Sequence, residues 1–263
     1  MICASASADD HIAPAGSGVL EVSKPPERAE RRPEAHASEG RSSHRVLRSV
    51  WIAGPAGKLE GLLNEGASDA AFAALVCHPY PPAGGTMHNR VVYHAMQVMN
   101  RRHWGFEFPV LRFNYRGVGL SGGVHDGKAE SEDVRAALDW LDGEFGRPIV
   151  LAGFSFGSAM ALKACCGSHG TDRRVRAVAA LGLPVEVGGR VHRYSLLEEA
   201  HLPKLFLSGA RDEFARPEQL EEIAARAAEP KRLILISGAD HFFTHQLSAM
   251  QQAMAGWLKE HLA

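Results

Sequence analysis

Three residues that follow apolar segments of this chain could together perform nucleophilic catalysis. The first is Ser155, at the centre of the sequence Gly-Phe-Ser-Phe-Gly at residues 153–157, directly after the apolar segment 149–152. A Gly-x-Ser-x-Gly motif between a strand and a helix predicts a nucleophile elbow, a strained turn that raises the serine hydroxyl above the edge of a sheet. Gly153 and Gly157 are expected because any side chain there would collide with the adjoining strand or helix.

A serine hydroxyl is a poor nucleophile at neutral pH and needs a base beside it. His241 follows the apolar segment 233–236, and Asp212 follows the segment 204–207. We predict that His241 is the base and that Asp212 orients it, since the order serine, acid, histidine is that of the elbow-containing hydrolases. Glu213 is the alternative acid if the loop is displaced by one residue.

The oxyanion of an acyl-transfer intermediate needs two backbone N–H donors. The residue after the nucleophile, Phe156, is expected to supply one. The loop after residues 72–77 begins His-Pro-Tyr-Pro-Pro, and its prolines have no N–H. Tyr80 is therefore the only amide donor between His78 and Ala83, and we predict it to be the second. His78 is expected to tie this loop to its neighbours.

The elements that must position these residues alternate along the chain from residue 46. Continuous apolar runs suit parallel strands that are buried on both faces. They lie at residues 72–77, 109–113, 149–152, 177–181, 204–207 and 233–236. Apolar residues with helical spacing predict helices around residues 134–141 and 220–227 and a terminal helix around 247–258. Residues 46–52 and 59–63 are expected to form an antiparallel hairpin. The pattern predicts an α/β fold with a mostly parallel, doubly wound sheet.

Composition narrows the functional classes further. The chain has 263 residues, is 45% hydrophobic and carries a net charge of −1. We therefore expect no nucleic-acid partner and no membrane partner, and no segment approaches the ~20 apolar residues that span a bilayer. The four cysteines, Cys3, Cys77, Cys165 and Cys166, do not form a disulfide framework. Reduced thiols and a cytoplasmic location are expected. Residues 1–45 carry few large apolar residues and are expected to be a disordered extension before a single domain at 46–263.

Two other patterns are set aside. Residues 117–122 match a dinucleotide-binding glycine motif, but no helix is expected before about Ser131 and no acidic residue is placed to hold a ribose. A turn with glycines at positive φ is the better interpretation. His245 lies four residues after His241, a spacing that suits a metal on a helix, but no third ligand is evident. No metal and no organic cofactor is expected.

Four segments together resemble the α/β-hydrolase superfamily, and in particular its small bacterial serine hydrolases with little or no cap domain. They are HPYPPAGGTMHNRVV at 78–92, FNYRGVGLSGG at 113–123, GFSFGS at 153–158 and GADHFF at 238–243. The resemblance covers residues 46–263. It implies an eight-stranded sheet, the triad Ser155–Asp212–His241 and hydrolysis of carboxylic esters through an acyl-enzyme. Relatives often have a proline four residues after the acid, whereas Pro217 follows Asp212 by five, so Asp212 and Glu213 both stay open.

The resemblance also indicates where a lid would be inserted. Residues 182–203 are too few for a large helical cap, so we expect a minimal lid and an open site that favours short acyl groups. Phe154, Phe242 and Phe243 are candidate pocket residues, although aromatic side chains there are as often core packing. A small ester is the expected substrate. Thioesters, amides or peptides would use the same triad, and a non-catalytic binding protein is the alternative from another class. The sequence leaves the oligomeric state open.

Overall fold

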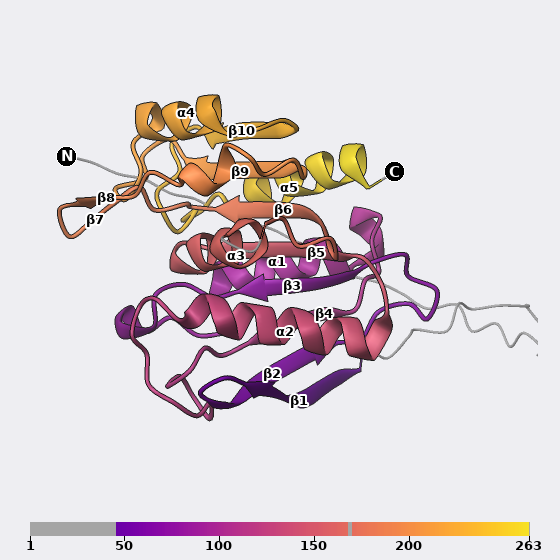
Figure 1. The fold of residues 1–263 in the computed structure, drawn as a ribbon. Helices are drawn as coiled ribbons and strands as arrows, with labels where there is room; N and C mark the ends of the chain where they lie inside the picture. Colours follow the sequence, from indigo (N-terminus) through magenta and orange to yellow (C-terminus); the bar gives the residue numbers. More distant parts are fainter. Residues whose placement is uncertain (1–45, 168–169, 263) are drawn as a thin grey trace, which may run out of the picture. The chain divides into compact units, whose positions relative to one another are not determined.

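A mixed sheet of eight strands forms the centre of the protein (Figure 1). The computed structural model describes residues 46–167 and 170–262, so the predicted extension at 1–45 lies outside the described residues. The strand order is β1-β2-β4-β3-β5-β6-β9-β10. The strands are β1 (Leu47–Gly54), β2 (Gly57–Asn64), β3 (Ala73–Cys77), β4 (Val110–Phe113), β5 (Ile149–Phe154), β6 (Val175–Leu181), β9 (Lys204–Gly209) and β10 (Lys231–Ile236).

Strand direction follows the predicted pattern. The hairpin of β1 and β2 is antiparallel, and β2 is also antiparallel to β4. All other neighbours in the sheet are parallel. Every residue of β3, β4, β5 and β9 is buried, because helices cover both faces of these strands. The predicted α/β doubly wound sheet and its eight strands are therefore confirmed.

Five α-helices of the described residues form the two outer layers. One hydrophobic cluster joins a face of the sheet to α1 (Arg90–Asn100) and α5 (Leu247–His261). The other cluster joins the opposite face to α2 (Glu130–Phe145), α3 (Phe156–Cys166) and α4 (Pro217–Arg226). Figure 1 shows α2 and α3 in front of the sheet and α1 behind it. None of the helices in the described ranges has the length and apolar character needed to cross a bilayer.

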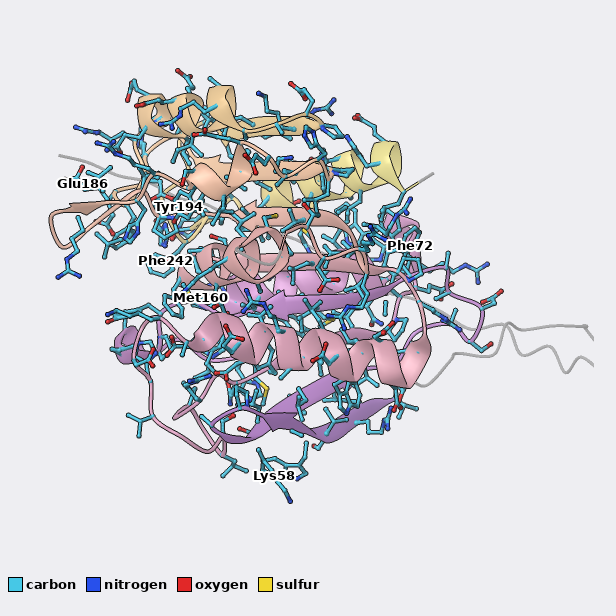
Figure 2. The ribbon with its side chains drawn as sticks, viewed as in Figure 1. Lys58, Phe72, Met160, Glu186, Tyr194 and Phe242 are labelled. Carbon is cyan, nitrogen blue, oxygen red and sulfur yellow. The ribbon has the colours of Figure 1, made fainter. Side chains whose placement is uncertain are left out.

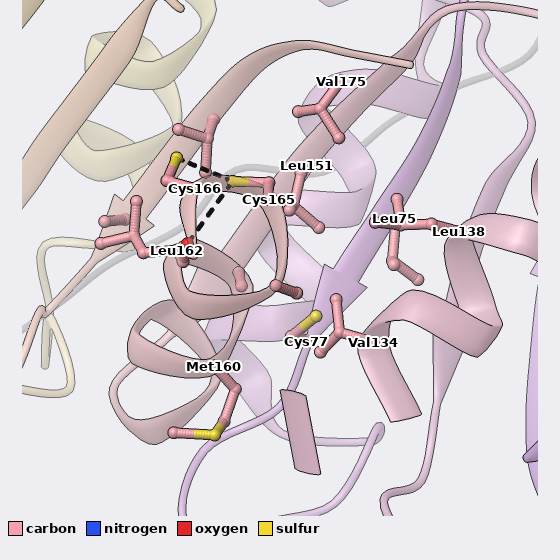
Figure 3. Packing of buried hydrophobic residues seen from close by; sticks show 14 of the residues in the cluster. Leu75, Cys77, Val134, Leu138, Leu151, Met160, Leu162, Cys165, Cys166 and Val175 are labelled. Atoms are coloured by element: carbon pink, nitrogen blue, oxygen red, sulfur yellow. Dashed lines mark hydrogen bonds between the residues drawn. The ribbon is translucent and has the colours of Figure 1, made fainter. Parts of the chain in front are cut away.

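The packing of α3 fixes the element that begins at the candidate nucleophile. Its Leu162 and Cys165 are fully buried against the sheet, in the same cluster as Leu151 of β5 and Val134 of α2 (Figure 3). The Sγ atoms of Cys165 and Cys166 lie 3.3 Å apart, and both cysteines are free thiols, as is Cys77. Helix α3 is apolar on most sides, because it packs between α2 and the sheet.

The segment where a lid would be inserted is small. Residues 182–203 form a two-stranded ribbon of β7 (Glu186–Val187) and β8 (Arg190–Val191), followed by the 3₁₀ helix η3 (Ser195–Leu197). No α-helix occurs in this described segment, so the predicted minimal lid is confirmed. The remaining 3₁₀ helices are η1 (Pro81–Ala83) and η2 (Arg102–Trp104).

Candidate active site

Ser155 lies between the end of β5 and the start of α3, in a backbone conformation that L residues rarely adopt. Its φ is 54° and its ψ is −123°. Such a conformation is costly and persists only where the surroundings fix it. The Ser155 amide donates to the Leu181 carbonyl of β6 at 2.9 Å, and the Ser158 hydroxyl donates to the Ser155 carbonyl at 2.6 Å. The predicted elbow geometry is thus present, held from both sides.

The two glycines of the motif are required by space rather than by φ. A Cβ on Gly153 would lie 2.3 Å from the Gly157 carbonyl oxygen, and a Cβ on Gly157 would lie 2.4 Å from the His78 carbonyl oxygen. Both distances are far below any normal contact with backbone atoms. The structure therefore confirms that side chains at these two positions would collide with the neighbouring elements.

A chain of hydrogen bonds runs from Ser155 to Asp212. His241 Nε2 lies 2.9 Å from Ser155 Oγ, and His241 Nδ1 lies 2.8 Å from Asp212 Oδ2. The carboxylate only accepts, so Nδ1 carries the hydrogen and Nε2 is left to accept from the serine hydroxyl. The three residues follow β5, β9 and β10, whose parallel carboxyl ends meet at one edge of the sheet.

The Asp212 carboxylate is fully engaged by hydrogen-bond donors. Oδ2 also accepts from the Ser208 hydroxyl at 2.7 Å, and Oδ1 accepts from the Phe214 amide at 2.8 Å. Glu213, the alternative acid, is exposed. The structure therefore brings Asp212, and not Glu213, to His241. Sequence reasoning missed Ser208, whose signal is a polar residue near the end of an otherwise apolar strand.

Aromatic side chains surround the His241 imidazole, which is only 3% exposed. Its ring centroid lies 4.5 Å from that of Phe214 and 5.0 Å from that of Phe154. Gly182, at a φ of 53°, passes so close that a Cβ there would lie 3.2 Å from His241 Cε1. Such an environment of low polarity strengthens the hydrogen bonds on both ring nitrogens.

The three candidate pocket residues lie in different surroundings. Phe242 is 51% exposed, and Figure 2 places it at the same side of the molecule as Met160 and Tyr194, away from Phe72. Phe154 and Phe243 are fully buried in the hydrophobic cluster of α1 and α5. Their predicted pocket role is corrected, because a side chain without exposed surface presents nothing to a substrate. The alternative of core packing holds for both.

The loop that carries Tyr80 is fixed by His78. His78 Nδ1 donates to the Pro79 carbonyl at 2.7 Å, and Nε2 accepts from the Tyr115 amide at 3.1 Å. Burial lowers the pKa of His78 to about 4, against a raising effect of the bond to Pro79 and a further lowering by His125. The imidazole is therefore neutral at physiological pH. These two bonds tie the loop to its neighbours, as expected of His78.

The two predicted oxyanion residues lie side by side. The ring centroids of Tyr80 and Phe156 are 5.6 Å apart. Within the described part of the chain, neither backbone amide donates a hydrogen bond. The Tyr80 carbonyl, in contrast, accepts from the amides of Ala83 and Gly85, which fixes the peptide that follows it. An oxyanion site requires backbone amides that are free to donate, and Phe156 directly follows Ser155.

The patterns set aside from the sequence have plain structural explanations. Gly117 and Gly119 have φ of 73° and 56°, and the next helix after them begins only at Glu130, so the glycine motif is a turn. His241 and His245 both precede α5, which begins at Leu247, and so they do not share a helix face. In residues 46–167 and 170–262, no group of three or more His, Cys, Asp or Glu side chains could hold a metal ion.

Comparison with known proteins agrees with this architecture. The α/β-hydrolase domain family matches residues 82–258, and the chain belongs to this family. A structure of an α/β serine hydrolase homologue from Coxiella burnetii is similar, with 31% identity and a TM-score of 0.70, covering 80% of this chain and 96% of that one. A serine hydrolase without a lid from Xanthomonas campestris has 26% identity and a TM-score of 0.70, covering 81% of this chain and 94% of that one.

A relative known from its sequence extends the comparison. An uncharacterized protein of Rickettsia prowazekii is 32% identical over 219 residues, which are 80% of this chain and 87% of that protein. The family, the fold and the arrangement at the carboxyl edge of the sheet all indicate a hydrolase.

Proposed function

We propose that this protein is a serine carboxylesterase that cleaves small esters through an acyl-enzyme. The observation that carries the proposal is the hydrogen-bonded chain from Ser155 Oγ through His241 to Asp212, at 2.9 and 2.8 Å, on a strained elbow. The small lid segment supports short acyl groups, since no helical cap encloses a long chain. The proposal includes a single catalytic domain at residues 46–263 and a cytoplasmic location.

The geometry supports the following roles in the first half-reaction. Ser155 Oγ attacks the ester carbonyl carbon while its proton moves to His241 Nε2. Asp212 stabilises the resulting imidazolium through the bond to Nδ1. The carbonyl oxygen becomes an oxyanion, which accepts hydrogen bonds from the amides of Phe156 and Tyr80. The intermediate then expels the alcohol, which takes the proton from His241.

The second half-reaction repeats these roles with water. His241 removes a proton from the water as it attacks the acyl carbon of the Ser155 ester. The same two amides bind the second oxyanion. Collapse of this intermediate releases the carboxylic acid and returns the proton to Ser155, so that the enzyme is regenerated.

A labelling experiment tests the nucleophile directly. The purified protein is treated with a fluorophosphonate, and the modified peptide is identified by mass spectrometry, with Ser155→Ala in parallel. We expect one label at Ser155 and none in the variant, and a turnover of p-nitrophenyl acetate that falls by about 10⁴-fold. Folded wild-type protein that takes no label, or a variant that keeps most of its turnover, would contradict the assignment.

A substrate panel tests the ester preference. Matched acetyl esters, thioesters and anilides are compared by kcat/KM, which measures discrimination between transition states. We expect the ester to be preferred over the anilide and acetyl over longer acyl groups. A higher kcat/KM for the thioester would reassign the protein as a thioesterase that uses the same residues.

A further inference from the structure

Three aromatic rings form a closed cluster beside Ser155, and one of them belongs to a residue outside the proposed mechanism. The ring centroid of His125 lies 5.4 Å from that of Tyr80 and 5.6 Å from that of Phe156. Tyr80 and Phe156 complete the triangle at 5.6 Å. All three pairs are close to perpendicular, at 74°, 69° and 61°, which is a favoured arrangement for aromatic pairs.

A buried carboxylate holds the His125 ring in place. His125 Nδ1 lies 2.6 Å from Glu130 Oε1, although the contact lacks the alignment of a hydrogen bond. Glu130 is the first residue of α2 and is fully buried. Its Oε1 also accepts from the amides of Asp126 and Gly127, in the loop that carries His125. The contact at Nδ1 therefore joins the loop and its histidine to the rigid start of a helix.

The surroundings of the Glu130 carboxylate favour its contact with His125. Glu130 Oε2 has no hydrogen-bond partner in the described part of the chain. A buried carboxylate is costly unless a positive group or hydrogen-bond donors compensate it. The His125 imidazole, 17% exposed, is the ring in contact with this carboxylate, with Nδ1 2.6 Å from Oε1. The ring is thus held between a buried charge on one side and two aromatic faces on the other.

We propose that His125, held by Glu130, is a positioning residue that fixes the oxyanion site through the rings of Tyr80 and Phe156. The inference rests on the proposed function, since it concerns the two amides assigned to the oxyanion. A backbone N–H cannot be reoriented by a side-chain rotation. The direction in which it donates is set by the placement of its peptide plane. His78 holds the Pro79–Tyr80 peptide through the Pro79 carbonyl, and the ring triangle adds to that placement by holding the Tyr80 side chain.

Tyr80 depends on the triangle more than Phe156 does. Phe156 begins a buried helix, and its ring also lies 5.7 Å from that of Tyr115. Tyr80 is 45% exposed, and its hydroxyl makes no hydrogen bond within the described residues. Its ring has only His125 and Phe156 as aromatic neighbours there. Loss of the His125 ring therefore loosens the Tyr80 amide first.

Ring deletion and ring replacement in the full chain test the proposal. His125→Ala removes the ring, while His125→Phe combined with Glu130→Gln keeps a ring and removes the charge that would be left unpaired. His103→Ala is the matched control, since His103 is an exposed histidine whose ring lies 5.0 Å from that of Trp104 in η2. Initial rates with p-nitrophenyl acetate give kcat and KM, and the rate of fluorophosphonate labelling reports the reactivity of Ser155.

We expect His125→Ala to lower kcat about tenfold with KM within about twofold of the wild type. Removal of a whole oxyanion donor costs about 10²–10³ in kcat, and a displaced donor costs less. The double variant should recover kcat to within about threefold of the wild type, and His103→Ala should match the wild type. Thermal melting by circular dichroism identifies any variant that is unfolded; if His125→Ala is unfolded, the double variant and Glu130→Gln carry the comparison.

The remaining outcomes overturn the proposal. An unchanged kcat in folded His125→Ala would show that the ring positions nothing. A raised KM with unchanged kcat would make His125 a substrate contact instead. A folded double variant as slow as His125→Ala would show that the ring is not the operative group. If the wild type takes no label at Ser155, the proposed function fails independently, before any of these variants is compared.

Discussion

The two sides of Ser155 are constructed in different ways. On the histidine side, side-chain atoms with defined partners form the site: each oxygen of Asp212 and each ring nitrogen of His241 has a hydrogen bond. On the oxyanion side, the candidate donors are backbone amides, and rings and one partly compensated carboxylate hold them. The histidine side depends on which side chains are present, whereas the oxyanion side depends on where the backbone lies.

This difference predicts different responses to substitution. Removing a group from a fully bonded network leaves a buried partner unpaired and alters the chemistry directly. Disturbing a packing cluster moves a peptide by a fraction of an ångström and changes the rate less. We therefore expect substitutions on the histidine side to cause large decreases that are specific to kcat. Substitutions on the oxyanion side should cause smaller, graded decreases in kcat. Those at His78 should also change the stability of the fold.

The largest expected effect in this comparison is that of Asp212→Asn. The amide of asparagine can donate to His241 Nδ1, which would leave the hydrogen on Nε2 and remove the acceptor that Ser155 needs. We expect kcat for p-nitrophenyl acetate to fall by about 10⁴-fold, as for loss of the charged member in other triads. Steady-state kinetics at neutral pH measure this.

Glu213→Gln is the matched control for that experiment. Glu213 is the adjacent acid and is exposed, so its change should leave kcat within about twofold of the wild type. The reverse result, a large loss at Glu213 and a small one at Asp212, would exchange the two acids and show that the loop after β9 rearranges when substrate binds.

A smaller effect is expected on the free energy of unfolding when the pH falls and His78, on the oxyanion side, takes up a proton. Burial lowers the pKa of His78 to about 4, from an ordinary value of 6.5. Between these values the unfolded chain binds the proton and the folded chain does not, so the free energy of unfolding falls as pH falls from 6.5 to 4. The difference amounts to about 3 kcal/mol. A protonated Nε2 would also direct an N–H at the Tyr115 amide, which it now accepts from.

Urea unfolding at a series of pH values tests this expectation against His78→Gln. Glutamine has no titrating group in this range, so the variant should be less stable at pH 7 but should lose less stability between pH 6.5 and 4. Equal slopes in the two proteins over that range would assign the acid sensitivity to other groups. His103→Ala, which changes an exposed histidine, should follow the wild-type curve.

The same contrast explains how much of the site could be predicted from the sequence. Ser155, His241 and Asp212 follow apolar runs, and because parallel strands end at one edge, chain order alone brought them together. Ser208 was missed because a buried serine near the end of β9 differs little from any strand residue until its bond to Asp212 is seen. His125 was missed because it lies in a loop whose glycines indicate only turns.

Two further features, helix α1 and the burial of Phe243, were also not predicted from the sequence. Helix α1 was not among the predicted helices, although its buried residues recur at helical spacing along one face, at positions 91, 92, 95, 96, 98 and 99. They are buried because α1 packs on the sheet and beside α5. The pocket role of Phe243 was wrong for a related reason: at a turn with φ of 53°, neighbouring residues point in unrelated directions, and Phe242 is exposed while Phe243 is not.

The smallest expected effect concerns one hydrogen-bond donor to Asp212 on the histidine side. Ser208→Ala removes one of three donors to the Asp212 carboxylate but leaves the Phe214 amide and His241 Nδ1 in place. A hydrogen bond to a charged group contributes about 1.5–3 kcal/mol, and the remaining donors retain part of it, so we expect kcat to fall about tenfold with KM unchanged. Ser208→Thr keeps the hydroxyl and should retain most of the rate. If Ser208→Ala matches the wild type, two donors suffice to orient Asp212, and the histidine side tolerates the loss of a partner as the oxyanion side is expected to do.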